Sequence, residues 1–241
     1  MTSFHGRVEI AKDAGALAHR VAEYFTQLAT ASNPRFTVAL SGGSTPKKLY
    51  ELLTSSEFRT RVPWGRILWF WGDERFVPHD DPDSNYRMTS EAMLSRVPIP
   101  RENIFPIPTD GDPDAAAAQY ETTLKQIYGR DSLDPNQPLF DLVLLGMGDD
   151  GHTASLIPGE PVLQDRKHWV AAVAHGRPEV RITLTYPVIE SSRHVAFLVQ
   201  GEAKAAMFRA IRSGNTDVPA ARVRPQGELI WFVDRAAAGS D

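Results

Sequence analysis

Cysteine is missing altogether from the 241-residue chain. This absence excludes disulfides, a thiol nucleophile, a redox dithiol and a cysteine-based zinc site. Long apolar runs are missing as well, since none approaches the roughly 20 residues that a membrane-spanning helix needs. Residues 1–12 lack the apolar core of a secretory signal. We therefore expect a soluble, cytoplasmic protein that does not associate with membranes.

An excess of positive charge is also lacking. The chain has 26 Lys and Arg against 30 Asp and Glu, a formal net charge of −4, which argues against broad nucleic-acid binding. We find no internal repeat and no low-complexity segment. The length allows a large core without metal or disulfide support. We expect a single domain over residues 1–241, monomeric or weakly self-associating, that is an enzyme or a small-molecule binder.

Short apolar runs alternate along the chain with longer amphipathic stretches, which predicts an α/β fold with a mainly parallel sheet covered on both faces. Helices are expected at residues 12–30, 46–53, 85–94, 115–128 and 202–211. Strands are expected at residues 35–40, 67–71, 139–145, 169–174, 181–185, 195–199 and 229–233. The two nearly continuous apolar strands, 67–71 and 139–145, suit central positions. Thr45 and Pro46 are predicted as the cap and first residue of the second helix.

Ligands of such sheets bind beyond the carboxyl ends of the strands, and the first polar loop in such a place is Ser-Gly-Gly-Ser-Thr. Gly42 and Gly43 allow a close approach of the backbone, and Ser44 and Thr45 add hydroxyls. The next helix offers free N–H groups, so the loop can cradle a phosphate. It lacks the Lys-Ser/Thr ending of a nucleotide-binding P-loop, so ATP is not implied. A glycine turn before a capped helix is an equally good interpretation.

The second polar loop, Trp71–Val77, follows an aromatic strand and precedes Ser84–Arg87. Asp73, Glu74 and Arg75 lie in it. They could form a surface ion pair worth less than about 1 kcal/mol. At the edge of an aromatic wall they could equally line a site for a small polar ligand.

The third loop, residues 146–152, reads Gly-Met-Gly-Asp-Asp-Gly-His. Its glycines match a dinucleotide fingerprint, but Asp149 and Asp150 would repel a pyrophosphate, so we reject that interpretation. The loop instead displays His152 beside carboxylates, which hold a histidine in one tautomer for proton transfer. Packing beside the next helix is the alternative, and we assign the other six histidines to such structural roles.

Together the three loops resemble the glucosamine-6-phosphate isomerase/6-phosphogluconolactonase family. Its members carry S-G-G-S-T-P, G-D-E-R-x-V with S-N-Y, and G-x-G-x-D-G-H-x-A-S-L-x-P. These motifs correspond here to Ser41–Pro46, Gly72–Val77 with Ser84–Tyr86, and Gly146–Pro158, and the resemblance continues through Arg181–Thr185 and Gly201–Lys204. Each motif is weak alone, but their order and spacing over essentially the whole chain are highly specific.

The resemblance implies a modified doubly wound, Rossmann-like fold. It implies the lactonase branch of the family, with hydrolysis of 6-phospho-D-glucono-1,5-lactone to 6-phospho-D-gluconate in the oxidative pentose phosphate pathway and no metal or organic cofactor. The partner is then a small sugar phosphate. It also implies a phosphate-binding set: Gly42, Gly43, Ser44, Thr45, Lys204 and Arg181. The catalytic set would be His152, Asp150, Arg75 and Asp73.

For lactone hydrolysis we expect neutral His152 to take a proton from water and return it to the ring oxygen, help typically worth about 10²–10⁴-fold. Arg75 is the candidate for the developing oxyanion, with the backbone N–H groups of Gly148–Gly151 as the alternative. The sequence leaves the partners of His152 and Arg75 undecided. Either of the adjacent aspartates could face the histidine, and Arg75 could pair with Glu74 outside the site.

Other functions fit the residues less well. A serine nucleophile lacks the G-x-S-x-G elbow, and a zinc on Asp150 and His152 lacks a third ligand. In the isomerase and deaminase branch, a glutamate five residues after the histidine supports it, and that position here is Ile157. A non-catalytic sugar-phosphate sensor would need the phosphate loop but not the Asp–His pair. It would usually carry a DNA-binding segment, for which the chain leaves no obvious room.

Overall fold

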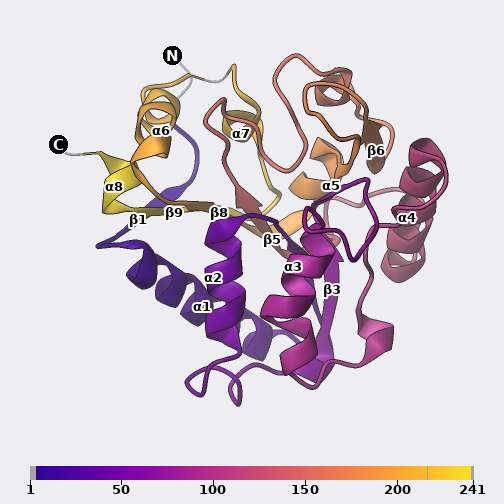
Figure 1. The fold of residues 1–241 in the computed structure, drawn as a ribbon, viewed down its shortest axis with the longest axis horizontal. Coiled ribbons are helices and arrows are strands. Elements are labelled where there is room, and N and C mark those ends of the chain that lie inside the picture. Colours follow the sequence, from indigo (N-terminus) through magenta and orange to yellow (C-terminus); the bar gives the residue numbers. More distant parts are fainter. Residues whose placement is uncertain (1–3, 216, 240–241) are drawn as a thin grey trace.

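A parallel β-sheet forms the centre of the computed structural model, which describes residues 4–215 and 217–239 (Figure 1). The six strands lie in the order β1 (Arg7–Ala11), β9 (Glu228–Asp234), β8 (Ser192–Val199), β5 (Phe140–Gly146), β2 (Phe36–Leu40) and β3 (Ile67–Trp71). All neighbouring pairs run parallel. All five residues of β3 are buried, but β3 is the edge strand of this sheet, so its expected central position is wrong. The segment at Ile104 and Phe105 lies beside this edge and helps to bury the strand. The central position expected for the strand at 139–145 is confirmed, because β5 lies between β8 and β2.

Helices cover both faces of this sheet (Figure 1). On one side lie α1 (Ala14–Ala31), α2 (Ser44–Leu53) and α3 (Asn85–Ala92). On the other lie α5 (Tyr186–Glu190), α6 (Ala205–Arg212) and α7 (Pro219–Arg222). The predicted α/β class and the covered, mainly parallel sheet are therefore confirmed. Within the described ranges, no helix has the length and apolarity to cross a membrane.

A second, three-stranded antiparallel sheet lies beside the first, in the order β4 (Asp73–Arg75), β7 (Arg181–Leu184) and β6 (Val170–Val173). Helix α4 (Pro113–Tyr128) packs along β6. We expected the strands at 169–174 and 181–185, but not a separate sheet, and residues 73–75 were read as loop. Apolar periodicity indicates a strand but not its partner, and three polar residues give no periodicity at all.

Several short elements differ from the prediction. The expected helix over 202–211 is a 3₁₀ turn at Glu202–Lys204 followed by α6. Strand β1 and helices α5, α7 and α8 (Arg235–Ala238) were not predicted. The three helices have at most five residues each, which is too short to show helical periodicity.

The order of the strands creates a crevice at the carboxyl end of the sheet. The chain passes from β2 outward to β3 and then returns to β5 on the opposite side of β2. Connections that leave β2 and β5 therefore diverge to opposite faces. In doubly wound sheets, such a switch point is where ligands bind. The Gly-Gly loop follows β2 here, and the loop with His152 follows β5.

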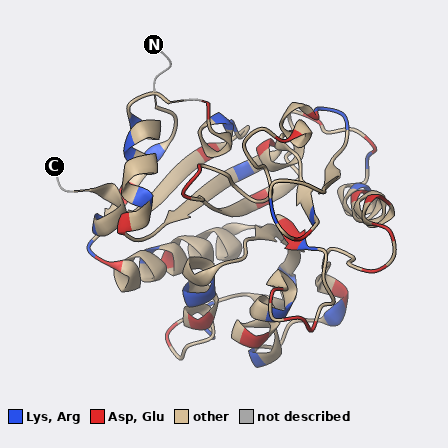
Figure 2. Cartoon of the chain, turned by 45° about the horizontal axis from the view of Figure 1, so that its top comes forward, with Lys and Arg blue, Asp and Glu red and all other residues tan. Residues whose placement is uncertain are grey.

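Figure 2 shows positively and negatively charged residues interspersed along the outer helices in this view. The sequence likewise has nearly equal numbers of residues of the two signs, 26 Lys and Arg against 30 Asp and Glu.

Candidate active site

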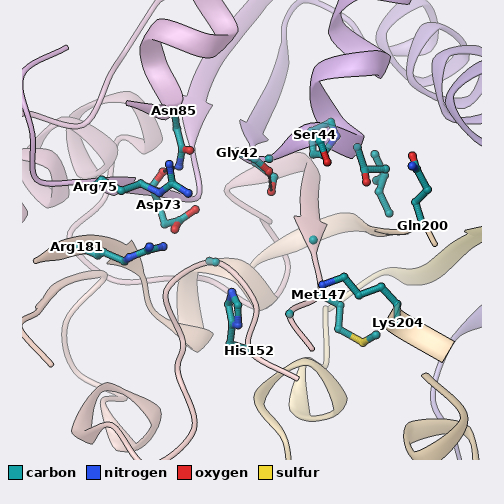
Figure 3. Close-up of a pocket in the computed structure, with 18 residues that line it drawn as sticks. Gly42, Ser44, Asp73, Arg75, Asn85, Met147, His152, Arg181, Gln200 and Lys204 are labelled. Carbon is teal, nitrogen blue, oxygen red and sulfur yellow. Dashed lines mark hydrogen bonds between the residues drawn. The ribbon is translucent and has the colours of Figure 1, made fainter. Parts of the chain in front are cut away.

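A hollow of about 230 Å³ lies where the crevice is expected, at the carboxyl ends of β2 and β5 (Figure 3). Nine of the ten residues that the sequence singled out line it: Gly42, Gly43, Ser44, Thr45, Asp73, Arg75, His152, Arg181 and Lys204. The tenth, Asp150, lies directly behind His152 and binds it. Segments that are far apart in the sequence thus meet around one cavity.

The Gly-Gly loop is fixed by its neighbours on both sides. Tyr50, which is fully buried, donates to the carbonyl of Ser41 at 2.8 Å and accepts from its backbone N–H at 3.0 Å. A Cβ on Gly42 would lie 1.9 Å from Oδ1 of Asn85, so only glycine fits there. Gly43 has a φ of 102°, which favours glycine as well. Tyr50 therefore holds the start of the loop, and the two glycines allow the backbone to take this path.

Helix α2 begins directly at this loop, and its first turn faces the hollow. Its cap is Gly43 and its first residue is Ser44, so the expected start at Pro46 with Thr45 as cap is wrong. No side chain among the described residues caps the helix. The first N–H groups, together with the hydroxyls of Ser44 and Thr45, are therefore available to an anion. This geometry favours the phosphate cradle over the simple capped turn.

Lys204 lines the hollow on the side of this helix (Figure 3). It follows Gly201 in the 3₁₀ turn after β8, and its Nζ donates to Oδ1 of Asp149 at 2.5 Å. The side chain of Asp149 is 70% exposed. One of the two adjacent aspartates thus faces the lysine, which leaves the other for the histidine.

The histidine of the third loop is held by Asp150. Oδ1 of Asp150 lies 2.6 Å from Nδ1 of His152 and also accepts the backbone N–H of His152 at 3.1 Å. A proton on Nδ1 satisfies this contact, so Nε2 of the neutral ring is free to accept one. The ring points into the hollow (Figure 3). A Cβ on Gly148 would lie 1.9 Å from Nδ1, so glycine is needed there for the pair to form.

The carboxylate of Asp150 has a second partner that no sequence motif revealed. Nη2 of Arg177 donates to its Oδ2 at 2.7 Å. Burial by itself would raise the pKa of Asp150, but the hydrogen bonds from Arg177 and His152 outweigh it and hold that pKa well below its ordinary value. Asp150 is therefore a carboxylate at any pH near neutrality.

Charged side chains that are buried or partly buried form the other side of the hollow, away from Lys204 (Figure 3). Arg75 in β4 is paired directly with Arg181 in β7. The Nε atoms of both arginines are buried and have no hydrogen-bond partner among the described residues. Asp73 is buried as well, and its Oδ2 accepts from Oγ of Ser155 at 2.7 Å. Burial lowers the pKa of Arg181, and the nearby charge of Arg75 adds to this, while Asp73 opposes it.

Glu74 leaves Arg75 free to face the hollow. Its buried carboxylate accepts from Oγ of Ser84 at 3.1 Å and from the backbone N–H groups of Asn85 and Tyr86, both at 2.7 Å. It thereby stabilises the start of α3. Burial raises the pKa of Glu74, although these hydrogen bonds oppose the rise. The side chain of Arg75 donates to the carbonyl of Asp83 at 2.5 Å, so the outward ion pair with Glu74 does not form.

Three further residues belong to the site, and the sequence did not assign a role to any of them. Asn85 and Gln200 line the hollow, and the buried Oε1 of Gln200 has no partner among the residues described. Asn85 lies in the S-N-Y motif and Gln200 directly follows a strand, so the sequence contains a weak indication that each belongs to a site. It contains no such indication for Arg177. Arg181 lies beside Arg75 rather than at the lysine end, where we expected it.

Potential metal ligands gather elsewhere. The described part of the chain has a single group of three such side chains close enough to share an ion: His19, Glu23 and Glu57. None of them lines the hollow.

At the switch point of a doubly wound sheet, the site thus combines an uncapped helix N-terminus with a histidine held by an aspartate. The profile of the family described as glucosamine-6-phosphate isomerases/6-phosphogluconolactonase matches residues 12–231. The chain belongs to this family. It is an enzyme of the lactonase branch, a hydrolase.

Relatives with the lactonase name match over nearly the whole chain. The 6-phosphogluconolactonase of Nostoc sp. is 44% identical over 241 residues, 97% of each chain. A solved structure of 6-phosphogluconolactonase from Leishmania guyanensis has a TM-score of 0.85 at 28% identity and covers 98% of this chain and 99% of its own. A monomeric glucosamine-6-phosphate deaminase is similar with a TM-score of 0.80, covering 96% and 98%, but at 22% identity it shows only the shared fold.

Proposed function

We propose that this enzyme hydrolyses 6-phospho-D-glucono-1,5-lactone to 6-phospho-D-gluconate in the cytoplasm, as a single domain and without a metal. The observation that carries the proposal is the shared hollow: the His152–Asp150 pair opens into the same cavity as the N-terminus of α2 and Lys204. A sugar phosphate has two chemically different ends, a dianion and a lactone. The hollow offers a matching arrangement for each.

The phosphate end of the substrate fits the start of α2. Backbone N–H groups, the hydroxyls of Ser44 and Thr45 and the ammonium of Lys204 all suit a dianion. Lys204 is already held in place by Asp149 and would share its protons with the phosphate. These contacts to the phosphate are distant from the reacting carbon, so their role is to fix the position of the lactone relative to the attacking water.

The lactone end then meets His152. Nε2 takes a proton from water as the water oxygen bonds to the carbonyl carbon, and Asp150 supports the imidazolium that forms. When the tetrahedral intermediate collapses, the bond from that carbon to the ring oxygen breaks and the imidazolium returns the proton to the ring oxygen. The collapse yields a carboxylic acid and a hydroxyl, and the acid then releases its proton to solvent as the carboxylate forms. One water is consumed and the histidine is regenerated.

The negative charge that develops on the carbonyl oxygen needs donors. The unpartnered Nε groups of Arg75 and Arg181 are the charged donors on this side of the hollow. We therefore assign Arg181 to the lactone end together with Arg75 and Asp73, instead of to the phosphate. In this arrangement the carboxylate of Asp73 accepts a hydrogen bond from a hydroxyl of the sugar. A donor of this kind is typically worth about 2.7–4 kcal/mol.

The substitution His152→Gln tests the proposal against His168→Gln. His168 also pairs with an aspartate, Asp165, at 2.8 Å, but lies outside the hollow, so it is a matched control. With the rate of lactone loss above the spontaneous rate as the readout, we expect kcat of the first variant to fall by at least about 100-fold with little change in KM. The control should retain full activity. Unchanged turnover in His152→Gln would reject the general base.

The activity of the unsubstituted enzyme should also fall as the pH is lowered, because a protonated imidazole cannot accept a proton from water. Release of ammonia from glucosamine 6-phosphate is the activity to exclude. Ile157, which is buried, provides no carboxylate for it. Ammonia release without faster lactone loss would assign the enzyme to the other branch.

A further inference from the structure

Arg177 lies in the loop between β6 and β7, at the rim of the site but not among the residues that line the hollow. The loop packs on the segment that follows His152. Gly176 has a φ of 77°, and a Cβ there would come within 3.0 Å of Ile157 and 3.1 Å of Glu160. Nη1 of Arg177 donates to the carbonyl of Gly176 at 2.8 Å, which folds its side chain back over its own loop.

In this position the guanidinium of Arg177 contacts both Asp150 and His152, which also contact each other, so the three side chains form a triangle. Nη2 of Arg177 donates to Oδ2 of Asp150 at 2.7 Å and lies 2.9 Å from Nδ1 of His152. The other oxygen of Asp150 binds that same Nδ1. The side chains of Arg177 and His152 are 26% and 27% exposed, so their charges are only partly screened by water.

The contacts in this triangle are not equivalent. Because Nδ1 carries the proton that binds Asp150, it cannot also accept a hydrogen bond from the guanidinium. The close approach of Arg177 to the ring is therefore a charge effect, which opposes protonation of the imidazole. Asp150 acts in the opposite direction and favours protonation. The two charges thus act on the ring in opposite directions, while the hydrogen bond between Arg177 and Asp150 holds the carboxylate in place.

We infer that Arg177 is a positioning residue that acts on His152 through Asp150. It holds the carboxylate in the orientation that keeps the proton on Nδ1, and it cancels enough of the negative charge to leave the ring neutral and ready to accept a proton at Nε2. This inference rests on the proposed role of His152. It deepens that role by explaining how a histidine bound to a full carboxylate stays a base.

The test compares Arg177→Gln and Arg177→Lys with Arg130→Gln. Arg130 also binds an aspartate, Asp134, at 2.9 Å, but on an exposed turn outside the hollow. In Arg177→Gln we expect kcat near neutral pH to fall about tenfold with KM unchanged. The acid limb of the kcat/KM profile should move to higher pH, because the unopposed carboxylate then favours the imidazolium. Arg177→Lys keeps the charge and should restore the profile, and Arg130→Gln should match the parent enzyme.

Three results would overturn the inference. A raised KM with unchanged kcat would mean that Arg177 binds substrate directly. A lower kcat with an unmoved pH profile and a lower melting temperature would mean that it only stabilises the loop. A tenfold further loss from Arg177→Gln in an Asp150→Asn background would show that it does not act through Asp150.

Titration of the ¹⁵N-labelled His152 ring in the substrate-free protein separates this inference from the proposed function. We expect the midpoint to move to higher pH in Arg177→Gln, and an unmoved midpoint overturns the inference even if the enzyme is active. The other charged groups around the hollow, Asp73, Arg75, Arg181 and Lys204, are the same in both proteins. An inactive parent enzyme would instead refute the proposed function, and the titration would still decide the role of Arg177.

Discussion

One end of the hollow presents backbone N–H groups and a lysine whose partner, Asp149, is 70% exposed, whereas the other end presents a buried aspartate beside two partly buried arginines whose Nε atoms are buried. The first end comes from a glycine loop and a helix terminus. The second comes from a pair of short antiparallel strands. Both are positively charged, but water screens them to different degrees.

The difference matches the charges that each end must meet. A phosphate is charged before it binds, so partly exposed donors attract it without the cost of burying a lone cation. The oxyanion exists only during the reaction, so donors that are already buried and fixed stabilise it most. The exposed end should therefore affect substrate binding, and the buried end should affect the rate of the chemical step.

The largest effect is expected at the buried end. Arg75→Met should lower kcat about 10²–10³-fold with little change in KM, because a preorganised donor to the oxyanion is lost. Arg181→Met, measured in the same way, shows how the two arginines share this role. Steady-state kinetics at several lactone concentrations provide both constants. A change confined to KM would place these arginines on the ground-state substrate and remove the distinction between the two ends.

A smaller effect of the opposite type is expected from Lys204→Ala. Loss of a charged hydrogen bond to the phosphate, typically about 1.5–3 kcal/mol, should raise KM by about tenfold or more and leave kcat nearly unchanged. Inorganic phosphate should also become a weaker competitive inhibitor. If kcat falls while KM is retained, the lysine acts on the reacting end and our orientation of the substrate is reversed.

The smallest effect is expected from Asp149→Asn. The exposed pair with Lys204 is worth less than about 1 kcal/mol, so its loss should lower KM about twofold because the phosphate no longer competes with a carboxylate. The difference should shrink as salt is added. Asp134→Asn removes a carboxylate from an ion pair with Arg130 outside the hollow and is the control. A clear rise in KM would mean that Asp149 positions the lysine instead of competing for it.

Much of the fold followed from apolar patterning. The strand at residues 67–71 has the predicted bounds, and the expected strand at 139–145 is β5 (Phe140–Gly146). Continuous apolar runs of this kind identify strands in the sequence because each strand is buried on both faces. The antiparallel sheet could not be predicted from the sequence, because β4 has only three residues and pairs with β7, which lies over 100 positions away in the chain.

The site divides in the same way. Ser44, Thr45 and His152 were found because glycine loops at strand ends mark them, and Lys204 was found through the resemblance to the family. The partners of the charged groups were not: Asp149 binds Lys204, Asp150 binds His152, and Glu74 supports α3 instead of pairing with Arg75. Adjacent carboxylates look alike in a sequence, since the direction of each side chain depends on the turn between them.

By itself, the sequence determined the class of fold, the family and the residue types that reach the carboxyl edge of the sheet, because local patterning and motif spacing encode these. Only the tertiary structure decided which charge faces which. It placed Arg181 opposite Arg75, and it brought Arg177 from a loop without any motif onto Asp150. Which charged groups pair depends on distances of a few ångströms between segments that are far apart in the sequence. No local pattern specifies those distances.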